Sequence, residues 1–209
     1  MKEEGGPEGT NPRGRRAEAT RRRIIAAANM LVAEFGVEGL TMRALAERVD
    51  YSATALYKYF KDKEELVSVL REESWKSMNA FADSAPIKAP DFLTALVESG
   101  KRMYAFAREN PGPYRSMMSP GRGFPSTMEE FFGHPNFVGL MRLVSEGAAR
   151  GDISLPAGAD AGTMGVFCFV VIHGASMLRM GLFREHASEW DALAESVIGL
   201  AGKMFAPKK

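Results

Sequence analysis

Residues 51–60, "YSATALYKYF", bring three tyrosines and a lysine onto about two helical turns. Tyrosine hydroxyls and a lysine ammonium suit phosphate oxygens, which receive most of the hydrogen bonds that proteins make to nucleic acids. A packed core has little use for so many hydroxyl-bearing rings. Tyr57, Lys58 and Tyr59 are therefore candidates for contacts with a phosphate backbone. The alternative is that the tyrosines pack against a neighbouring helix, and we expect this for part of Tyr51.

Small residues precede these side chains. Ser52 can cap a helix, and Ala53 and Ala55 would let its backbone come close to a nucleic acid. Thr54 can donate or accept a hydrogen bond at a base edge, and a methyl group can contact thymine. This stretch predicts the start of a helix that lies in a major groove.

Two short helices with matching caps must position these residues. Thr41 can cap the first helix, with Leu40 and Leu45 at the two hydrophobic-staple positions, and Ser52 can cap the second. The turn between them contains Asp50, which tolerates left-handed geometry better than most residues. Together with a preceding helix, this arrangement is typical of a helix-turn-helix.

Longer helices are predicted on both sides of the pair. Asp62 and Glu65 form a capping-box-like start for a helix that runs to about Asp83. Gly36 is a typical C-terminal stop for the helix that begins near residue 17. The apolar stripe of that first helix consists of Ile24, Ala28, Leu31 and Phe35.

The N-terminal segment 1–16 has four glycines, two prolines and no large apolar residue beyond Met1, so we expect a disordered basic arm. Six arginines lie between residues 13 and 23. Such a run is either a solvated helix end or an arm that reaches phosphates or a neighbouring minor groove. Both interpretations remain open.

Charge is distributed unevenly along the chain of 209 residues. Residues 13–63 carry eleven Lys and Arg against six Asp and Glu, a net +5, whereas residues 64–209 carry fifteen against seventeen, a net −2. The single Cys168 suggests a reducing compartment. No apolar run reaches membrane-spanning length, and no stretch near the N-terminus resembles a signal peptide. We expect a cytoplasmic protein without a membrane partner.

The remaining sequence also shows helical periodicity, and no alternating strand pattern occurs, so the predicted fold class is all-α. One helix starts near Phe92 and ends near Asn110, and Pro111 can begin the next. Residues 119–126 form a loop, and Gly133 with Pro135 interrupts the helical stretch that follows. A connection at 151–159 leads to two long final helices, roughly 160–182 and 188–205.

The segment "LTMRALAERVDYSATALYKYFKDKEELV" resembles the DNA-binding signature of the TetR (tetracycline-repressor) family of bacterial regulators. The resemblance spans roughly residues 18–70 and implies a helix-turn-helix domain at 17–62 and a helical regulatory and dimerisation domain at 63–209. Asp50 replaces a usual turn glycine and Thr54 often corresponds to a glycine, which leaves the operator sequence open. The implied phosphate contacts are Thr41, Tyr57, Tyr59 and Lys63, and the implied base contacts are Arg43, Ala53, Thr54 and Ala55.

The segments "RMYAFARENPGPYRSMM" and "FVVIHGASMLRMG" resemble a regulatory domain found in part of this family, whose "HG" pair follows an aromatic residue, here Phe169 before His173. The resemblance implies a hydrophobic pocket for a small-molecule effector. Taken alone, His173 fits a satisfied core histidine better, and the thirteen methionines and thirteen phenylalanines are also ordinary core filling. The expected lining residues are Met103, Tyr104, Phe106, Met117, Phe131, Phe137, Met141, Phe169 and His173.

The last predicted helix is apolar nearly all round, so it must be covered. The family resemblance implies that the two final helices pair with their twofold mates, and Ala161, Gly162 and Gly165 would allow close approach. Packing within one chain is the alternative. The expected interface residues are Trp190, Leu193, Ala194, Val197, Ala201 and Met204.

Other chemistry has little support in the sequence. The three histidines show no metal-ligand spacing, and neither a nucleophile-elbow motif nor a phosphate-binding loop occurs, so we expect no enzyme, cofactor or metal. The sequence predicts a homodimeric repressor that binds a palindromic double-stranded DNA operator and is released by an effector. An activator, a ligand-insensitive regulator and a small-molecule-binding protein without DNA binding remain alternatives.

Overall fold

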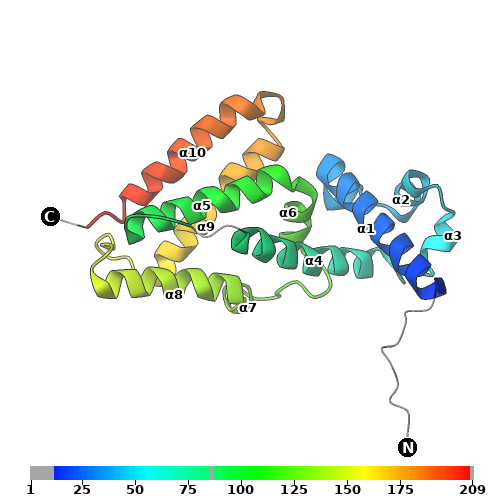
Figure 1. Ribbon diagram of the computed structural model, residues 1–209, viewed down its shortest axis with the longest axis horizontal. Helices are drawn as coiled ribbons and strands as arrows, with labels where there is room; N and C mark the ends of the chain where they lie inside the picture. The colour runs from blue at the N-terminus through cyan, green and yellow to red at the C-terminus, as the bar shows by residue number, and fades with distance from the viewer. Residues whose placement is uncertain (1–11, 85–86, 208–209) are drawn as a thin grey trace, which may run out of the picture.

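The computed structural model describes residues 12–84 and 87–207, and these contain helices but no strand. The predicted all-α class is confirmed. Figure 1 shows α1–α3 at one end of the molecule, α8–α10 at the other, and α4 running between them. The helices are α1 (Pro12–Gly39), α2 (Met42–Val49), α3 (Ala53–Leu56), α4 (Lys63–Asp83), α5 (Phe92–Glu109), α6 (Pro111–Met117), α7 (Met128–Phe132), α8 (Pro135–Arg150), α9 (Ala161–Met180), the 3-10 turn η1 (Arg184–His186) and α10 (Ala187–Lys203).

The start of α1 differs from the prediction. Residues 12–16 belong to this helix and not to a disordered arm, while residues 1–11 of the predicted arm lie outside the described part of the chain. Pro12 suits the first turn of a helix because it has no N–H to leave unpaired, and arginine has a high helix propensity. At the other end, Gly36 has φ of 73° and breaks the helical geometry where the sequence predicts a stop.

The predicted caps are present in α2 and α3. The Thr41 hydroxyl accepts a hydrogen bond from the Ala44 N–H at 3.0 Å, and the Ser52 hydroxyl accepts one from Ala55 at 3.1 Å. Asp50 adopts the expected left-handed conformation, with φ of 58° and ψ of 48°. The local sequence therefore determines where these two short helices begin and end.

A single buried cluster holds the helix-turn-helix together. Leu45 of α2 and Leu56 of α3 are fully buried, and Leu66 and Leu70 of α4 complete the same cluster. The structural unit thus extends beyond residue 62, where the sequence places the domain boundary. The cluster consists of Ile24, Ile25, Ala27, Ala28, Leu31, Val32, Leu40, Leu45, Ala46, Val49, Leu56, Phe60, Leu66, Val67 and Leu70.

Helix α4 begins as predicted. The Asp62 carboxylate accepts a hydrogen bond from the Glu65 N–H at 2.7 Å, and Glu65 in turn accepts one from the Lys61 N–H at 2.6 Å. The Glu65 N–H and the nearby Arg122 guanidinium lower the pKa of Asp62. The capping carboxylate therefore stays charged at neutral pH and favours the helix N-terminus.

Helix α6 joins the two ends of the molecule. A Cβ at Gly112 would lie 2.1 Å from the Asn29 carbonyl oxygen, so only glycine permits this approach of α6 to α1. Arg115 of the same helix donates to the Val32 carbonyl at 3.4 Å and to the Met180 carbonyl at 2.7 Å. These contacts connect α1 to the C-terminal end of α9.

Helix α9 runs through the larger domain and packs against α5, α8 and α10. Among the described helices it alone is long and apolar enough to cross a membrane, judged by length and composition, although the sequence analysis found no such run. A core helix of a helical domain passes the same test. Gly165 packs against Met141 of α8, so this small residue serves contact within the chain.

Candidate DNA interface and ligand pocket

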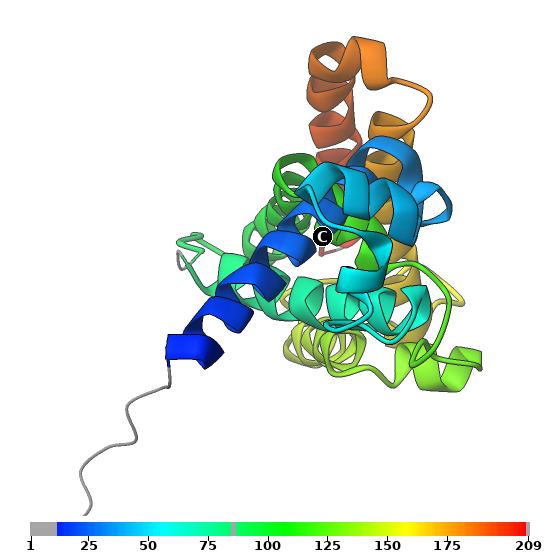
Figure 2. The ribbon, with the colours of Figure 1, turned by 90° about the vertical axis from the view of Figure 1, so that its right-hand side faces the viewer.

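The α3 region presents an exposed edge at the end of the molecule that faces the viewer in Figure 2. The side chains of Ser52, Thr54, Tyr57 and Lys58 are exposed, while Leu56 is fully buried and anchors the helix. Small residues on the outside leave the backbone accessible to a groove.

The tyrosines divide between the surface and the core. Tyr57 is 53% exposed, whereas Tyr51 and Tyr59 pack partly against the buried cluster of the helix-turn-helix. The packing alternative for part of Tyr51 is thus confirmed, and it applies to Tyr59 as well. Ala53 packs against the same cluster, and Ala55 is also half-buried.

Two of the candidate cations have partners within the chain. Arg43 lies 3.1 Å from Glu47 one turn further along α2, and both side chains are largely exposed. The Lys63 ammonium donates to the Glu38 carbonyl at 3.4 Å, which places it beside Thr41 and the start of α2. Thr41, Arg43 and Lys63 therefore lie near one another on the side of the domain that carries α2.

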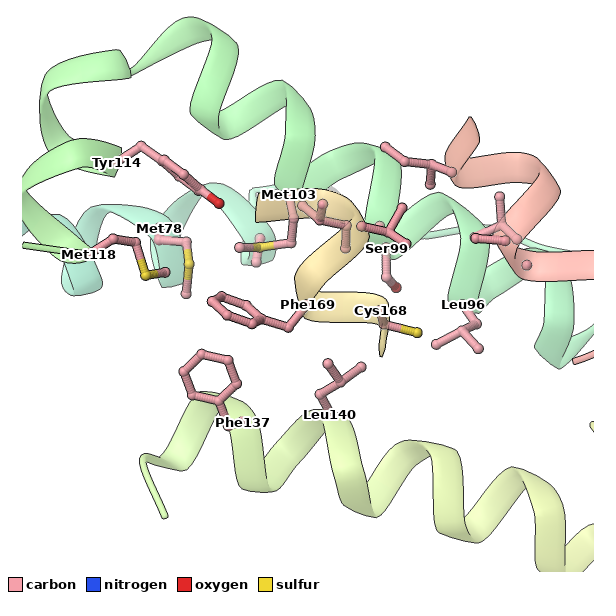
Figure 3. A pocket seen from close by; sticks show the side chains of 18 of the residues that line it. Met78, Leu96, Ser99, Met103, Tyr114, Met118, Phe137, Leu140, Cys168 and Phe169 are labelled. Carbon is pink, nitrogen blue, oxygen red and sulfur yellow. The ribbon is translucent and has the colours of Figure 1, made fainter. Parts of the chain in front are cut away.

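A cavity of about 280 Å³, the central cavity, lies among α4, α5, α8, α9 and α10 (Figure 3). Three of the expected lining residues, Met103, Phe137 and Phe169, do line it. Its described walls consist of Trp75, Met78, Asn79, Ala82, Leu96, Val97, Ser99, Gly100, Met103, Tyr114, Met118, Phe137, Leu140, Cys168, Phe169, Val171, Ile172, Ile198, Ala201, Gly202 and Phe205.

The other six expected lining residues do not line the central cavity. Phe106 and Met117 belong to a buried cluster with Tyr114, and Met141 packs against Gly165. Met117 and Phe131 border a second space of about 570 Å³, the side cavity, between α4 and the loop before α7. Successive side chains point in different directions around a helix, so neighbours such as Met118 and Leu140 face the central cavity in place of the expected residues.

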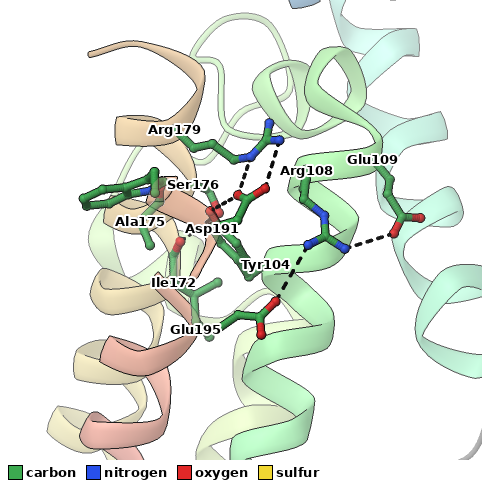
Figure 4. Close-up of polar contacts among 10 residues, drawn as sticks. Tyr104, Arg108, Glu109, Ile172, Ala175, Ser176, Arg179, Asp191 and Glu195 are labelled. Carbon is green, nitrogen blue, oxygen red and sulfur yellow. Dashed lines mark hydrogen bonds and ion pairs between the residues drawn. The ribbon is translucent and has the colours of Figure 1, made fainter. Parts of the chain in front are cut away.

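Tyr104 is wrong as a lining residue because its hydroxyl is committed elsewhere (Figure 4). It donates to the Asp191 carboxylate at 2.6 Å, and Arg179 donates to the same carboxylate, also at 2.6 Å. Burial and the Asp191 carboxylate raise the pKa of Tyr104, so its hydroxyl stays protonated. This network joins α5, α9 and α10.

His173 fits the core-histidine alternative. Its Nδ1 lies 3.2 Å from the Tyr114 hydroxyl, and its ring stacks on Phe169 with centroids 5.2 Å apart. Burial lowers the pKa of His173, which favours the neutral ring. His173 therefore supports two residues of the cavity wall and does not line the cavity itself.

The expected interface residues of α10 lie on two different faces. Leu193, Val197 and Met204 are exposed, by 54%, 41% and 51%. Ala194 is buried and Ala201 lines the central cavity. These two residues were wrong as interface candidates, because their face of α10 packs inside the chain.

Trp190 also packs within the chain. Its indole N–H donates to the Ala175 carbonyl at 2.9 Å and its ring stacks on Phe183, with centroids 4.4 Å apart. The exposed apolar stripe instead includes Leu200, which is 64% exposed. Helical spacing alone predicted a single apolar stripe on α10. The exposure of the side chains shows that α10 has one apolar face packed inside the chain and another exposed to solvent.

Sequence reasoning missed the wall that α4 contributes. Trp75, Met78 and Asn79 face the central cavity from a helix whose bounds were predicted from the sequence but whose side chains were not proposed to line a pocket. Their helical spacing was the available signal, but a buried core produces the same pattern.

Among the described residues, no group of three His, Cys, Asp or Glu could hold a metal ion.

Comparison with known proteins identifies the family that the DNA-binding part of the chain resembles. Residues 24–70 match the family described as "Bacterial regulatory proteins, tetR family". The matched segment covers the helix-turn-helix and the start of α4, so residues 24–70 form a DNA-binding domain of the TetR type. The protein is a DNA-binding regulator and not an enzyme.

More distant similarities extend beyond the DNA-binding part and cover 66% to 93% of the chain. The nucleoid occlusion factor SlmA of Haemophilus ducreyi is 28% identical over 148 residues, which cover 66% of this chain and 71% of that protein. A TetR family transcription regulator from Marinobacter aquaeolei has a similar structure, with a TM-score of 0.65, 20% identity and coverage of 93% and 99% of the two chains. FadR from Bacillus subtilis, solved with stearoyl-CoA, gives a TM-score of 0.62, 18% identity and coverage of 88% and 98%. These structures share the fold of both domains.

Proposed function

We propose that the protein is a cytoplasmic repressor that binds a palindromic operator as a homodimer and is released when a small molecule fills the central cavity. The observation that supports this most strongly is that one helix, α4, contributes both to the core of the DNA-binding domain and to the wall of the central cavity. Helix α4 contributes Leu66 and Leu70 to the core beneath α3 and Trp75 and Met78 to the cavity wall. The resemblance of the C-terminal half to an "HG" regulatory domain agrees with this function.

The proposed DNA contacts follow from the position of α2 and α3. The proposed phosphate contacts are Thr41, Tyr57, Lys58, Tyr59 and Lys63. Tyr57 and Lys58 are exposed directly after α3, and Lys63 lies beside the exposed Thr41 at the start of α2. Base edges would be met by Arg43 and the small side chains Ser52, Ala53, Thr54 and Ala55. Arg43 would leave Glu47 to do so, and such an exposed pair is worth only about 0–1 kcal/mol.

The proposed homodimer would cover the exposed apolar stripe of α10. Leu193, Val197, Leu200 and Met204 follow one another at helical spacing, and Val170 of α9 is 58% exposed. A twofold axis brings identical surfaces together and matches the symmetry of a palindromic site. Dimerisation through the exposed face of α10 would leave the α3 end of each subunit accessible, since α10 lies away from α3 in Figure 1.

Ligand binding would reach the DNA-binding domain through α4 and the loop before α7. Arg71 of α4 donates to the carbonyls of Ser119 and Arg122, each at 2.8 Å, and holds this loop against the helix. The Arg122 side chain lies 3.2 Å from Asp62 and 3.1 Å from Glu64 at the start of α4. A ligand acts only if it binds one position of α4 more tightly than another.

Variants of the α3 region test the DNA-binding part. Tyr57→Phe and Lys63→Ala should weaken binding to all sequences about equally, and Lys63→Ala should make the salt dependence shallower by about one unit. Thr54→Ala should change which operator variants are preferred. Fragments selected from genomic DNA, followed by anisotropy titrations across a salt series, provide the measurement.

Lys76→Ala is the matched control, because Lys76 lies on the same helix as Lys63 but pairs with Glu72, away from α3. It should leave DNA affinity unchanged. Equal effects of the two lysine variants would contradict the proposed placement of α3 in the groove.

A further inference from the structure

The described walls of the central cavity contain no Asp, Glu, Lys, Arg or His side chain. Aromatic rings such as Trp75 and Phe169 and aliphatic side chains such as Ile198 provide most of the surface. A charged molecule that entered this space would lose its hydration shell without gaining a counter-charge, which is strongly unfavourable. The absence of charge in the wall therefore limits the chemistry of the ligand.

The polar groups of the wall are few and neutral. They are the Asn79 amide, the Ser99 and Tyr114 hydroxyls and the Cys168 thiol. Burial raises the pKa of Tyr114 to about 12 and that of Cys168 to about 11, so both remain protonated at neutral pH. Ser99 already donates to the Ala95 carbonyl at 2.8 Å.

Tyr114 lies at one end of the cavity in Figure 3, with Met78 and Met118, and its hydroxyl points inward. Leu96 and Cys168 lie toward the other end. Ser99 also lies toward that end, but its hydroxyl donates to the Ala95 carbonyl, whereas the Tyr114 hydroxyl points into the cavity.

Charged groups near the cavity are bound to other partners. Arg102 donates to the Phe81 carbonyl at 2.7 Å, and Lys101 pairs with Glu98 at 2.9 Å. The neighbouring side cavity contains Arg71, but its guanidinium donates to loop carbonyls, and the same cavity contains two glutamates. An anionic head group would find no uncommitted cation in these places.

We propose that the central cavity binds an uncharged, mainly apolar molecule whose one hydrogen-bonding group meets Tyr114. This inference rests on the proposed function, since it names the chemical class of the effector. A long-chain alcohol fits these requirements, whereas a free carboxylate or an ammonium ion of the same length does not. The rival is an anion whose head group extends past Trp75 and Phe137 into the side cavity, because these two residues border both spaces.

Direct binding to the full-length protein tests the ligand class. Calorimetric titration at pH 7 would compare 1-decanol, kept below its solubility limit, with decanoate and decylammonium, kept below their micelle concentrations. We expect 1-decanol to bind at least about tenfold more tightly than either ion. Decanoate binding as tightly as the alcohol would overturn the proposal in favour of the anionic rival, and absence of alcohol binding would also overturn it.

Matched serine variants test the location. Ser99→Leu fills the cavity, whereas Ser196→Leu makes the same change on the exposed face of α10, where the serine also donates to the carbonyl four residues earlier. Ser99→Leu should lower 1-decanol affinity about tenfold or more, and Ser196→Leu should not. Leu140→Trp provides a second filling variant, and circular dichroism would confirm that each variant folds.

Equal 1-decanol affinity in the filled variants and the control would overturn the location. DNA release is measured separately from these titrations. If 1-decanol binds as expected but operator affinity does not change, the ligand class stands and ligand-responsive repression is wrong.

Discussion

In the DNA-binding domain one continuous buried cluster extends from Ile24 to Leu70, whereas the larger domain divides its buried side chains among three clusters beside two cavities. A continuous core resists deformation, because every side chain already has neighbours on all sides. A core interrupted by cavities lacks those contacts and can gain them from a ligand. The DNA-binding domain is therefore expected to be rigid, whereas the larger domain can adjust its packing around a ligand.

The largest expected effect concerns the outer surface of the larger domain. Val197→Asp together with Leu200→Asp would place carboxylates in the proposed dimer interface, and burying each unpaired charge costs several kcal/mol. We expect sedimentation to show monomers that remain helical. Ala192→Asp, on another exposed face of α10, is the control and should leave the dimer intact. An unchanged dimer in the double variant would move the interface to another surface.

The next effect compares the two cores directly. Leu45→Ala should destabilise the protein by about 2–5 kcal/mol, because Leu45 is fully buried in the continuous cluster. Leu140→Ala should cost less than about 1.5 kcal/mol, since this half-buried leucine already faces empty space. Urea unfolding of both variants measures the difference, and equal losses of stability would refute the contrast between the cores.

A smaller effect is expected from the helix caps. Ser52→Ala removes the cap of α3 and should cost about 1 kcal/mol, and it should also weaken DNA binding because α3 loses its start. Thr127→Ala removes the equivalent hydroxyl cap of α7, where the hydrogen bond from Glu130 is 3.1 Å long. Its stability loss should be similar, with DNA affinity unchanged. A similar loss of DNA affinity in both variants would mean that the effect is not local to α3.

The smallest effect on stability should come from Arg122→Ala. Its partners Asp62 and Glu64 are partly exposed, so solvent screens the ion pairs and they contribute little to stability. We expect near-normal DNA affinity without ligand but a smaller change in affinity when an effector is added. Titrations of operator DNA with and without effector would reveal this, and a full response would exclude the loop as a connection between the domains.

The helix-turn-helix could be predicted closely because its determinants are local. Thr41 and Ser52 each cap a helix by accepting a bond from a residue three positions later, and Asp50 turns the chain through its own backbone angles. Contacts at such short separation follow from residue order alone. The disordered arm was mispredicted at residues 12–16, since the helix tolerates Gly14 and begins at Pro12.

The cavity and the faces of α10 depended on tertiary packing. Residue types and spacing determined that α9 and α10 are apolar helices and that aromatic side chains lie near them. Which side chains face the cavity was decided by the rotation of each helix against its neighbours, so Met118 lines the space and Met117 does not. Trp75 and Phe169 are 94 residues apart in the chain and meet at one cavity only because α4 and α9 are held in the same domain. Periodicity identifies an apolar face, but burial against a particular partner is a property of the assembled fold.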